Sequence, residues 1–253
     1  MKKSMIITMA VLFSFKVHSQ IKLKPIEYQQ GDTQLLGTLY YDPILKSKRG
    51  GILLVHDVEG QIDFIKQNAQ SLATAGYIVF VADLFGKDVK EKDDVVKSLQ
   101  EDRTLLLERT RVALDILKEQ SSVDPLRLAS IGYGLGGTAV LDLARSGAQT
   151  RATACFYGNL ATVTPAQPLS IQGIVLIYLG NNDPNIPPEE ITAFKEEMNN
   201  ADVDWQINLY GKAVHGFANP EAGDDVASGT AYYYHAERRS MESLKAILFM
   251  LLK

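Results

Sequence analysis

The chain is organised around the stretch LRLASIGYGLGGTAVLDLA, residues 126–144. This stretch opens with an apolar run of strand length, passes through Gly132, Gly134, Gly136 and Gly137, and continues with apolar residues at helical spacing. Glycine is favoured where a turn is tight and where one backbone segment approaches another closely. The stretch therefore predicts a strand that turns sharply into a helix.

The segments on either side of this stretch alternate between strand and helix patterns. GGILLVH (50–56) and YIVFVAD (77–83) are continuous apolar runs, and the amphipathic FIKQNAQSLATAG (64–76) separates them. Uninterrupted apolar strands joined by helices are typical of a parallel sheet that is covered on both faces. The chain is therefore predicted to have an α/β fold.

The residue patterns also predict the remaining strands and helices. PIEYQQGDTQLLGTLYYD (25–42) contains two strand-like runs joined at Gly31-Asp32, which predicts an antiparallel hairpin at the N-terminal side of the sheet. A charged helical segment is expected over about Glu91 to Glu119. After the glycine-rich stretch we expect the strands ATACFY, GIVLIYL and WQINLY, the helix EEITAFKEEMNN, and a last helix ending in SLKAILFMLL. This pattern predicts roughly six parallel strands beside the hairpin.

The first 19 residues have the pattern of a secretory signal peptide. Lys2 and Lys3 precede an apolar run from Met5 to Phe15, and the small residue Ser19 follows. The run is too short to span a bilayer as a stable anchor. We expect cleavage near Ser19-Gln20 and a secreted or periplasmic product, with a disordered or buried N-terminus as the alternative.

Residues 20–253 are expected to form a single domain, because no linker or repeat divides them. A net charge of -4, with 46% hydrophobic and 22% charged residues, is ordinary for a globular protein and provides no basic stripe for nucleic acid. Nothing indicates a membrane partner after cleavage. Cys155 is the only cysteine, so no intrachain disulfide can form. The chain is expected to be a monomer or a small homo-oligomer.

Four blocks of sequence together resemble the dienelactone hydrolase family of the α/β-hydrolase superfamily. They are HDVEG (56–60), GYGLGG (132–137), GNNDPNIPPE (180–189) and YGKAVHGFANP (210–220), and the similarity extends over residues 25–252. Their order and their positions after predicted strands carry the resemblance. It implies an α/β-hydrolase fold: a mostly parallel central sheet with helices on both faces and an N-terminal antiparallel hairpin.

The resemblance also implies roles for individual residues. GYGLG matches the nucleophile elbow, in which glycines flank a nucleophile on a sharp strand-to-helix turn, and the nucleophile position is Gly134. Asp183 and His215 match the acid and the base of a triad. Each follows a late strand, as the chain order nucleophile, acid, base requires. The backbone N–H groups of Val58 and Leu135 match the oxyanion hole.

Each of these assignments has a simpler alternative. Asp183 precedes a proline and could be a turn residue, and His215 could be a packed loop histidine. His56 ends an apolar strand and is expected to support the following loop. Ser130 lies within a predicted strand and Cys155 in the middle of another, so neither is expected to replace the missing nucleophile.

The chain departs from the family at the positions that carry chemistry. The family's glutamate after the first-strand histidine is Asp57, and two arginines that hold a substrate carboxylate are missing, with Lys87 as the nearest substitute. We therefore expect a neutral substrate. The pocket is expected to be lined by Asp57, Phe85, Lys87, Tyr133 and Phe217, with no metal.

Two functions remain open at this point. The first is a hydrolase of small ester or lactone substrates with an incomplete triad, because Gly134 stands in place of Cys or Ser. The alternative is a catalytically inactive pseudoenzyme that binds a small molecule. Gly132-x-Gly134-x-x-Gly137 also fits a dinucleotide fingerprint, but Phe156 to Asn159 stand where the required acidic residue would be. No cofactor is therefore expected.

Overall fold

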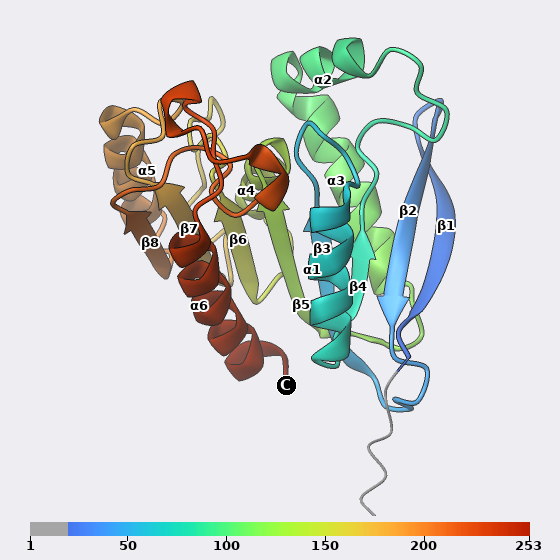
Figure 1. Cartoon of the computed structure of the whole chain (residues 1–253). Helices are drawn as coiled ribbons and strands as arrows, with labels where there is room; N and C mark the ends of the chain where they lie inside the picture. Colours follow the sequence, from blue (N-terminus) through green and yellow to red (C-terminus); the bar gives the residue numbers. More distant parts are fainter. Residues whose placement is uncertain (1–19) are drawn as a thin grey trace, which may run out of the picture.

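The computed structural model describes residues 20–253, so the predicted signal peptide lies outside the described residues. One eight-stranded sheet runs through the molecule in the order β1-β2-β4-β3-β5-β6-β7-β8 (Figure 1). The strands are β1 (Lys22–Gln30), β2 (Thr33–Tyr41), β3 (Arg49–Val55), β4 (Ile78–Val81), β5 (Val123–Tyr133), β6 (Ala152–Phe156), β7 (Ile174–Gly180) and β8 (Trp205–Tyr210).

The antiparallel hairpin is confirmed. Gln30 pairs with Thr33, and Gly31 between them has φ +54°, a conformation that glycine adopts without strain. β2 then pairs antiparallel with β4, whereas all pairs from β4 through β3, β5, β6 and β7 to β8 are parallel. The predicted six parallel strands are therefore present, and helices connect consecutive strands among these six except β6 and β7, which are joined by a loop.

Helices cover both faces of the sheet. α1 (Asp63–Thr74) and α6 (Tyr234–Leu252) lie on one face, and α3 (Arg103–Lys118), α4 (Leu135–Arg145) and α5 (Pro188–Asn200) lie on the other (Figure 1). β3 contributes side chains to the core on both faces of the sheet. Its Ile52 and Leu54 belong to the core cluster under α1 and α6, and its Leu53 and Val55 to the cluster under α3 and α4. A strand buried on both faces explains the uninterrupted apolar run.

The charged segment expected as one helix is two helices. α2 (Lys92–Glu101) ends at Asp102, and α3 begins directly after it. The Asp102 side chain accepts hydrogen bonds from the backbone N–H groups of Thr104 and Leu105 at 2.9 and 3.0 Å. An N-cap aspartate satisfies donors that the first turn of a helix leaves free. This cap changes the direction of the chain and brings the end of α2 toward the carboxyl ends of the strands (Figure 1).

No helix within residues 20–253 is long and apolar enough to cross a membrane.

Candidate active site

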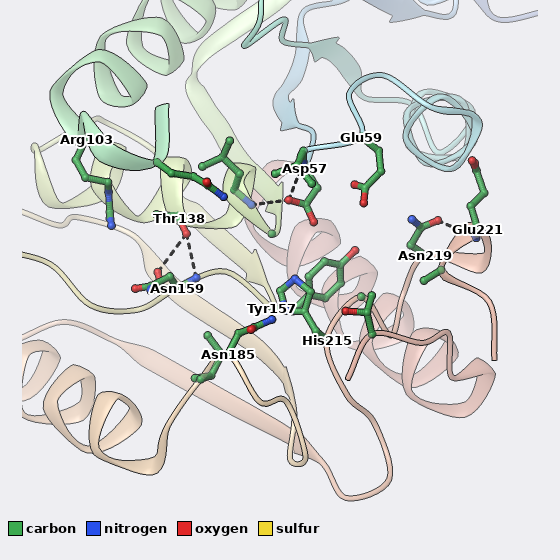
Figure 2. A pocket seen from close by; sticks show the side chains of 18 residues that line it. Asp57, Glu59, Arg103, Thr138, Tyr157, Asn159, Asn185, His215, Asn219 and Glu221 are labelled. Atoms are coloured by element: carbon green, nitrogen blue, oxygen red, sulfur yellow. Dashed lines mark hydrogen bonds between the residues drawn. The ribbon is translucent and has the colours of Figure 1, made fainter. Parts of the chain in front are cut away.

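A pocket of about 680 Å³ lies where the loops after the parallel strands converge. Asp57 to Glu59 follow β3, Gly134 and Leu135 follow β5, Tyr157 follows β6, Asn185 follows β7 and His215 follows β8. Figure 2 shows the side chains of Asp57, Glu59, Tyr157, Asn185 and His215 directed toward a common space. The volume is typical of small-molecule sites, and the location is the one that open parallel sheets favour.

The turn between β5 and α4 has the geometry of an elbow. A Cβ at residue 132 would overlap the carbonyl of Gly136, and a Cβ at residue 136 would overlap the carbonyl of Val55. Both flanking glycines are therefore required by the close approach of the helix start to the strands. Gly134 at the apex has φ +49° and ψ −115°, which residues with a Cβ rarely adopt.

The space above Gly134 is filled by Asp57. A Cβ built on Gly134 would overlap all three atoms of the Asp57 carboxylate group. The carboxylate of the loop after β3 therefore occupies the position where the elbow's own side chain would begin. The Asp57 carboxylate can pack in this position because residue 134 has no side chain.

One oxygen of Asp57 is held by two backbone donors. The N–H groups of Val58 and Leu135 each donate to Asp57 Oδ1 at 2.8 Å. These are the two groups that the family resemblance assigns to the oxyanion hole. Burial raises the pKa of Asp57, and the two hydrogen bonds and the nearby His215 counteract part of that rise. The donors converge as an oxyanion hole requires, and the protein's own carboxylate occupies them.

His215 and Asp183 lie in hydrogen-bond contact. His215 Nδ1 is 2.9 Å from Asp183 Oδ2, and the Asp183 side chain is fully buried. Asp183 Oδ1 accepts from the backbone N–H of Asn185 at 2.8 Å, so both carboxylate oxygens have partners. Because an ionised carboxylate only accepts, His215 Nδ1 carries the proton and Nε2 is left as the basic nitrogen.

The charges around His215 favour its protonated form. Burial alone would lower the pKa of His215. The hydrogen bond to Asp183 and the negative charges of Asp183, Asp57 and Glu59 outweigh burial and raise that pKa above its ordinary value. The backbone of His215 is also fixed, since its N–H donates to Gly229 and its carbonyl accepts from Ala231. The base candidate is therefore both oriented and more basic than a free imidazole.

Comparison with known proteins identifies the family of the chain. The model of the dienelactone hydrolase family matches residues 36–250 of the chain. The chain belongs to the dienelactone hydrolase family.

Solved structures show similarity over nearly the whole domain. The chain is 34% identical to the protein m3DLH, with a TM-score of 0.83 and coverage of 92% of this chain and 99% of that one. It is 31% identical to a dienelactone hydrolase-like promiscuous phosphotriesterase from metagenomic libraries, with a TM-score of 0.84 and the same coverage. A Bradyrhizobium sp. relative, named "Probable 2-oxo-3-(5-oxofuran-2-ylidene)propanoate lactonase", is 25% identical over 190 residues, covering 69% of this chain and 76% of that protein.

Several predicted pocket residues of this dienelactone hydrolase family member lie outside the pocket lining. Phe85 is buried with its ring edge against His56, and Phe217 is fully buried in the core beneath the base loop. Lys87 is exposed and pairs with Glu27 of β1 at 2.6 Å. Tyr133 is buried and borders a small neighbouring cavity but not the main pocket. These four residues were predicted to line the pocket because they lie close in sequence to its loops. In the structure, Phe85, Phe217 and Tyr133 point into the protein interior, and Lys87 points toward β1 of the N-terminal hairpin.

His56 supports the loop that carries Asp57, as its sequence position suggested. The Leu84 N–H donates to His56 Nε2 at 3.2 Å, so Nδ1 bears the proton and donates to the Asp57 carbonyl at 2.7 Å. Burial lowers the pKa of His56, which keeps the ring neutral. His56 therefore fixes the backbone of Asp57 and is not a second base.

Sequence reasoning missed the other groups that surround the pocket. Tyr157 has a positive φ of +41°, an uncommon conformation for a tyrosine, and its ring edge packs on His215 with the ring centroids 5.1 Å apart. Glu59 adds a carboxylate to the rim, whereas the Glu221 carboxylate is directed away from the pocket and accepts a hydrogen bond from the Phe64 N–H (Figure 2). The HDVEG block offered a signal for Glu59, but no local pattern indicates Tyr157 or Glu221.

Arg103 is the cation of the rim, and its charge is already paired. Its guanidinium forms two hydrogen bonds to Asp142, at 2.6 and 2.7 Å. Asp142 also contacts Arg145, which in turn holds Glu197. The bidentate pair orients Arg103 and reduces its availability for a ligand.

Neither Ser130 nor Cys155 can replace the missing nucleophile. Ser130 is buried and its hydroxyl contacts that of Thr153 at 3.2 Å. Cys155 is buried within β6, and burial raises the pKa of its thiol to about 12. No group of three or more His, Cys, Asp or Glu side chains in the described part of the chain could hold a metal ion. The start of α4, where a dinucleotide phosphate would bind, faces the Asp57 carboxylate.

Proposed function

We propose that this protein hydrolyses small, neutral ester or lactone substrates, with His215 as the general base and Asp183 as its orienting acid. The observation that carries the proposal is the His215 Nδ1 to Asp183 Oδ2 contact of 2.9 Å beside a pocket of about 680 Å³. This hydrogen bond places the proton on Nδ1 and leaves Nε2 free to accept a proton, as general-base catalysis requires. The name of the Bradyrhizobium relative supports a lactone as one substrate class.

The charge of the rim supports a neutral substrate. The carboxylates of Asp57 and Glu59 border the pocket, while the positive charge of Arg103 is paired with Asp142. An anionic substrate would meet carboxylates without a free guanidinium to bind it. The name of the Bradyrhizobium relative refers to a propanoate, so this chain is proposed to differ from that relative in the group it binds.

Turnover of a panel of short-chain aryl esters and lactones tests the proposal. His215→Gln should reduce kcat by roughly 10²–10⁴-fold, the usual contribution of a general base. His235→Gln is the matched control, because His235 is an exposed histidine that does not border the pocket. Equal activity of wild type and His215→Gln on every substrate would contradict the proposal, as would a preference for a free carboxylate over its methyl ester.

Occupation of the oxyanion-hole donors by Asp57 favours a second function, binding of a small molecule without catalysis. Because Asp57 Oδ1 already accepts from Val58 and Leu135, an ester carbonyl has no free donors there unless the Asp57 side chain moves. A pseudoenzyme that only binds a small molecule would show ligand-dependent rises in melting temperature and no turnover. Turnover that depends on His215 would exclude it.

A further inference from the structure

The two oxygens of the Asp57 carboxylate have different surroundings. Oδ1 accepts from the N–H groups of Val58 and Leu135, whereas Oδ2 has no hydrogen-bond partner among residues 20–253. Asp57 borders the pocket, and Figure 2 shows its second oxygen directed toward the space that His215 and Tyr157 also face. One oxygen is anchored by backbone donors, and the other is presented to whatever enters the pocket.

The Asp57 carboxylate, from the loop after β3, has the placement expected of a nucleophile at residue 134. The carboxylate overlaps the position of the missing Cβ at residue 134, so it stands where the elbow would present its side chain. Burial removes water from a carboxylate and makes it a better nucleophile toward a reacting atom. His56 and the two backbone donors fix its orientation, as a reactive group requires.

We propose that Asp57 is the nucleophile of this protein and that it attacks a saturated carbon bearing a leaving group that is stable as an anion. This inference rests on the proposed function and specifies it: within the lactones, the bond cleaved is the one between the alkyl carbon and the ring oxygen. Attack at an ester carbonyl is disfavoured, because the donors that would stabilise the carbonyl oxygen already bind Asp57 Oδ1.

In the first step a lone pair of Asp57 Oδ2 forms a bond to the saturated carbon. The bond from that carbon to the leaving group breaks, and its electron pair leaves with a carboxylate or a halide. An alkyl ester of Asp57 results, and the negative charge has passed from Asp57 to the leaving group. No base is needed in this step.

In the second step His215 Nε2 takes a proton from water, and the water oxygen bonds to Asp57 Cγ. The charge develops on Oδ1, which the Val58 and Leu135 N–H groups already bind at 2.8 Å. Collapse breaks the bond from Cγ to Oδ2, and the departing alkoxide takes the proton from His215. Asp57 then loses its remaining proton to solvent. The Val58 and Leu135 N–H groups, which bind Asp57 Oδ1 before substrate enters, therefore act as the oxyanion hole of this step.

A single turnover in water enriched in the heavy oxygen isotope tests the proposal, with enzyme in excess over (R)-β-butyrolactone or 2-bromoacetamide. We expect the peptide containing Asp57 to gain one heavy oxygen and the product hydroxyl to gain none, since that hydroxyl oxygen comes from Asp57. The lactone should also give a product of inverted configuration. Asp57→Asn, which keeps the acceptor Oδ1 and loses the nucleophilic oxygen, should lose at least roughly 10²-fold in turnover of both probes.

Asp63→Asn is the matched control, since the Asp63 side chain is 78% exposed on α1 and does not border the pocket. It should react as wild type does. Heavy oxygen in the product with none in Asp57, or lactone opening with retained configuration, would overturn the inference and leave the proposed function standing. If neither probe turned over and Asp57 gained no label, the inference would also be overturned, and the aryl-ester panel with His215→Gln would judge the proposed function separately.

Discussion

At the scale of single residues, Gly134 and Asp57 must be considered together. Gly134 can adopt φ +49° and ψ −115° without strain, and the volume above it holds the Asp57 carboxylate. The sequence identified residue 134 as the apex of the elbow and Asp57 as a neighbour. It could not indicate their contact, because no local pattern specifies where a side chain from another loop will point.

Gly134→Cys should lower the free energy of unfolding by about 1–3 kcal/mol through backbone strain, with a further loss because the Asp57 carboxylate must move. Chemical denaturation measures the change. The double variant Gly134→Cys/Asp57→Gly removes the overlap, so it should be acylated by an activated ester faster than the single variant. Equal stability of Gly134→Cys and wild type would show that residue 134 is not at a strained apex.

The ionisation of His215 should appear as a pH-dependent stability. Its pKa is raised in the folded protein, so His215 contributes stability fully below its unfolded pKa of about 6.5 and loses it as pH rises through the folded value. The stability advantage of wild type over His215→Gln should therefore shrink with increasing pH above about 6.5. Urea denaturation at several pH values measures it, and an advantage that grows with pH would contradict the assignment.

At the scale of elements, strands were predictable and one helix boundary was not. The continuous apolar runs indicated β3, β4 and β7 because both faces of these strands are buried. The break between α2 and α3 was missed because helical residues lie on both sides of Asp102, so its position in the sequence does not distinguish an N-cap from an exposed aspartate within one helix. Only the hydrogen bonds of its side chain reveal the cap.

Asp102→Ala should destabilise the protein by about 1 kcal/mol, because the N–H groups of Thr104 and Leu105 lose their acceptor. Arg103 follows this cap and borders the pocket, so KM should change more than kcat. Asp93→Ala, an exposed aspartate in the first turn of α2, is the control and should cost less. Indistinguishable denaturation midpoints for the two variants would contradict a capping role.

At the scale of the whole molecule, the order of the motifs predicted the architecture and the meeting of Asp183 with His215. Residues from loops after five different strands form the pocket, and the rule that parallel strands end at one edge was sufficient to bring them together. The rim was harder to predict. Phe85 and Phe217 belong to the core, whereas Tyr157 enters the pocket through an uncommon backbone conformation that sequence periodicity does not encode.

Export remains a prediction, because residues 1–19 lie outside the described part of the chain. The charged start and short apolar run predict that the mature protein begins at Gln20 and is secreted or periplasmic. Intact mass spectrometry of protein isolated from its native host measures the N-terminus. A cytosolic product that retains the first 19 residues would contradict this prediction.

Intact-mass and peptide mass spectrometry of His215→Gln after incubation with 2-bromoacetamide tests directly whether Asp57 is the nucleophile. The first step uses Asp57 Oδ2 alone and the second needs the base, so this variant should accumulate one alkyl ester located at Asp57. The double variant Asp57→Asn/His215→Gln should accumulate none. An unmodified His215→Gln protein, or the same adduct mass in both variants, would show that Asp57 is not the nucleophile.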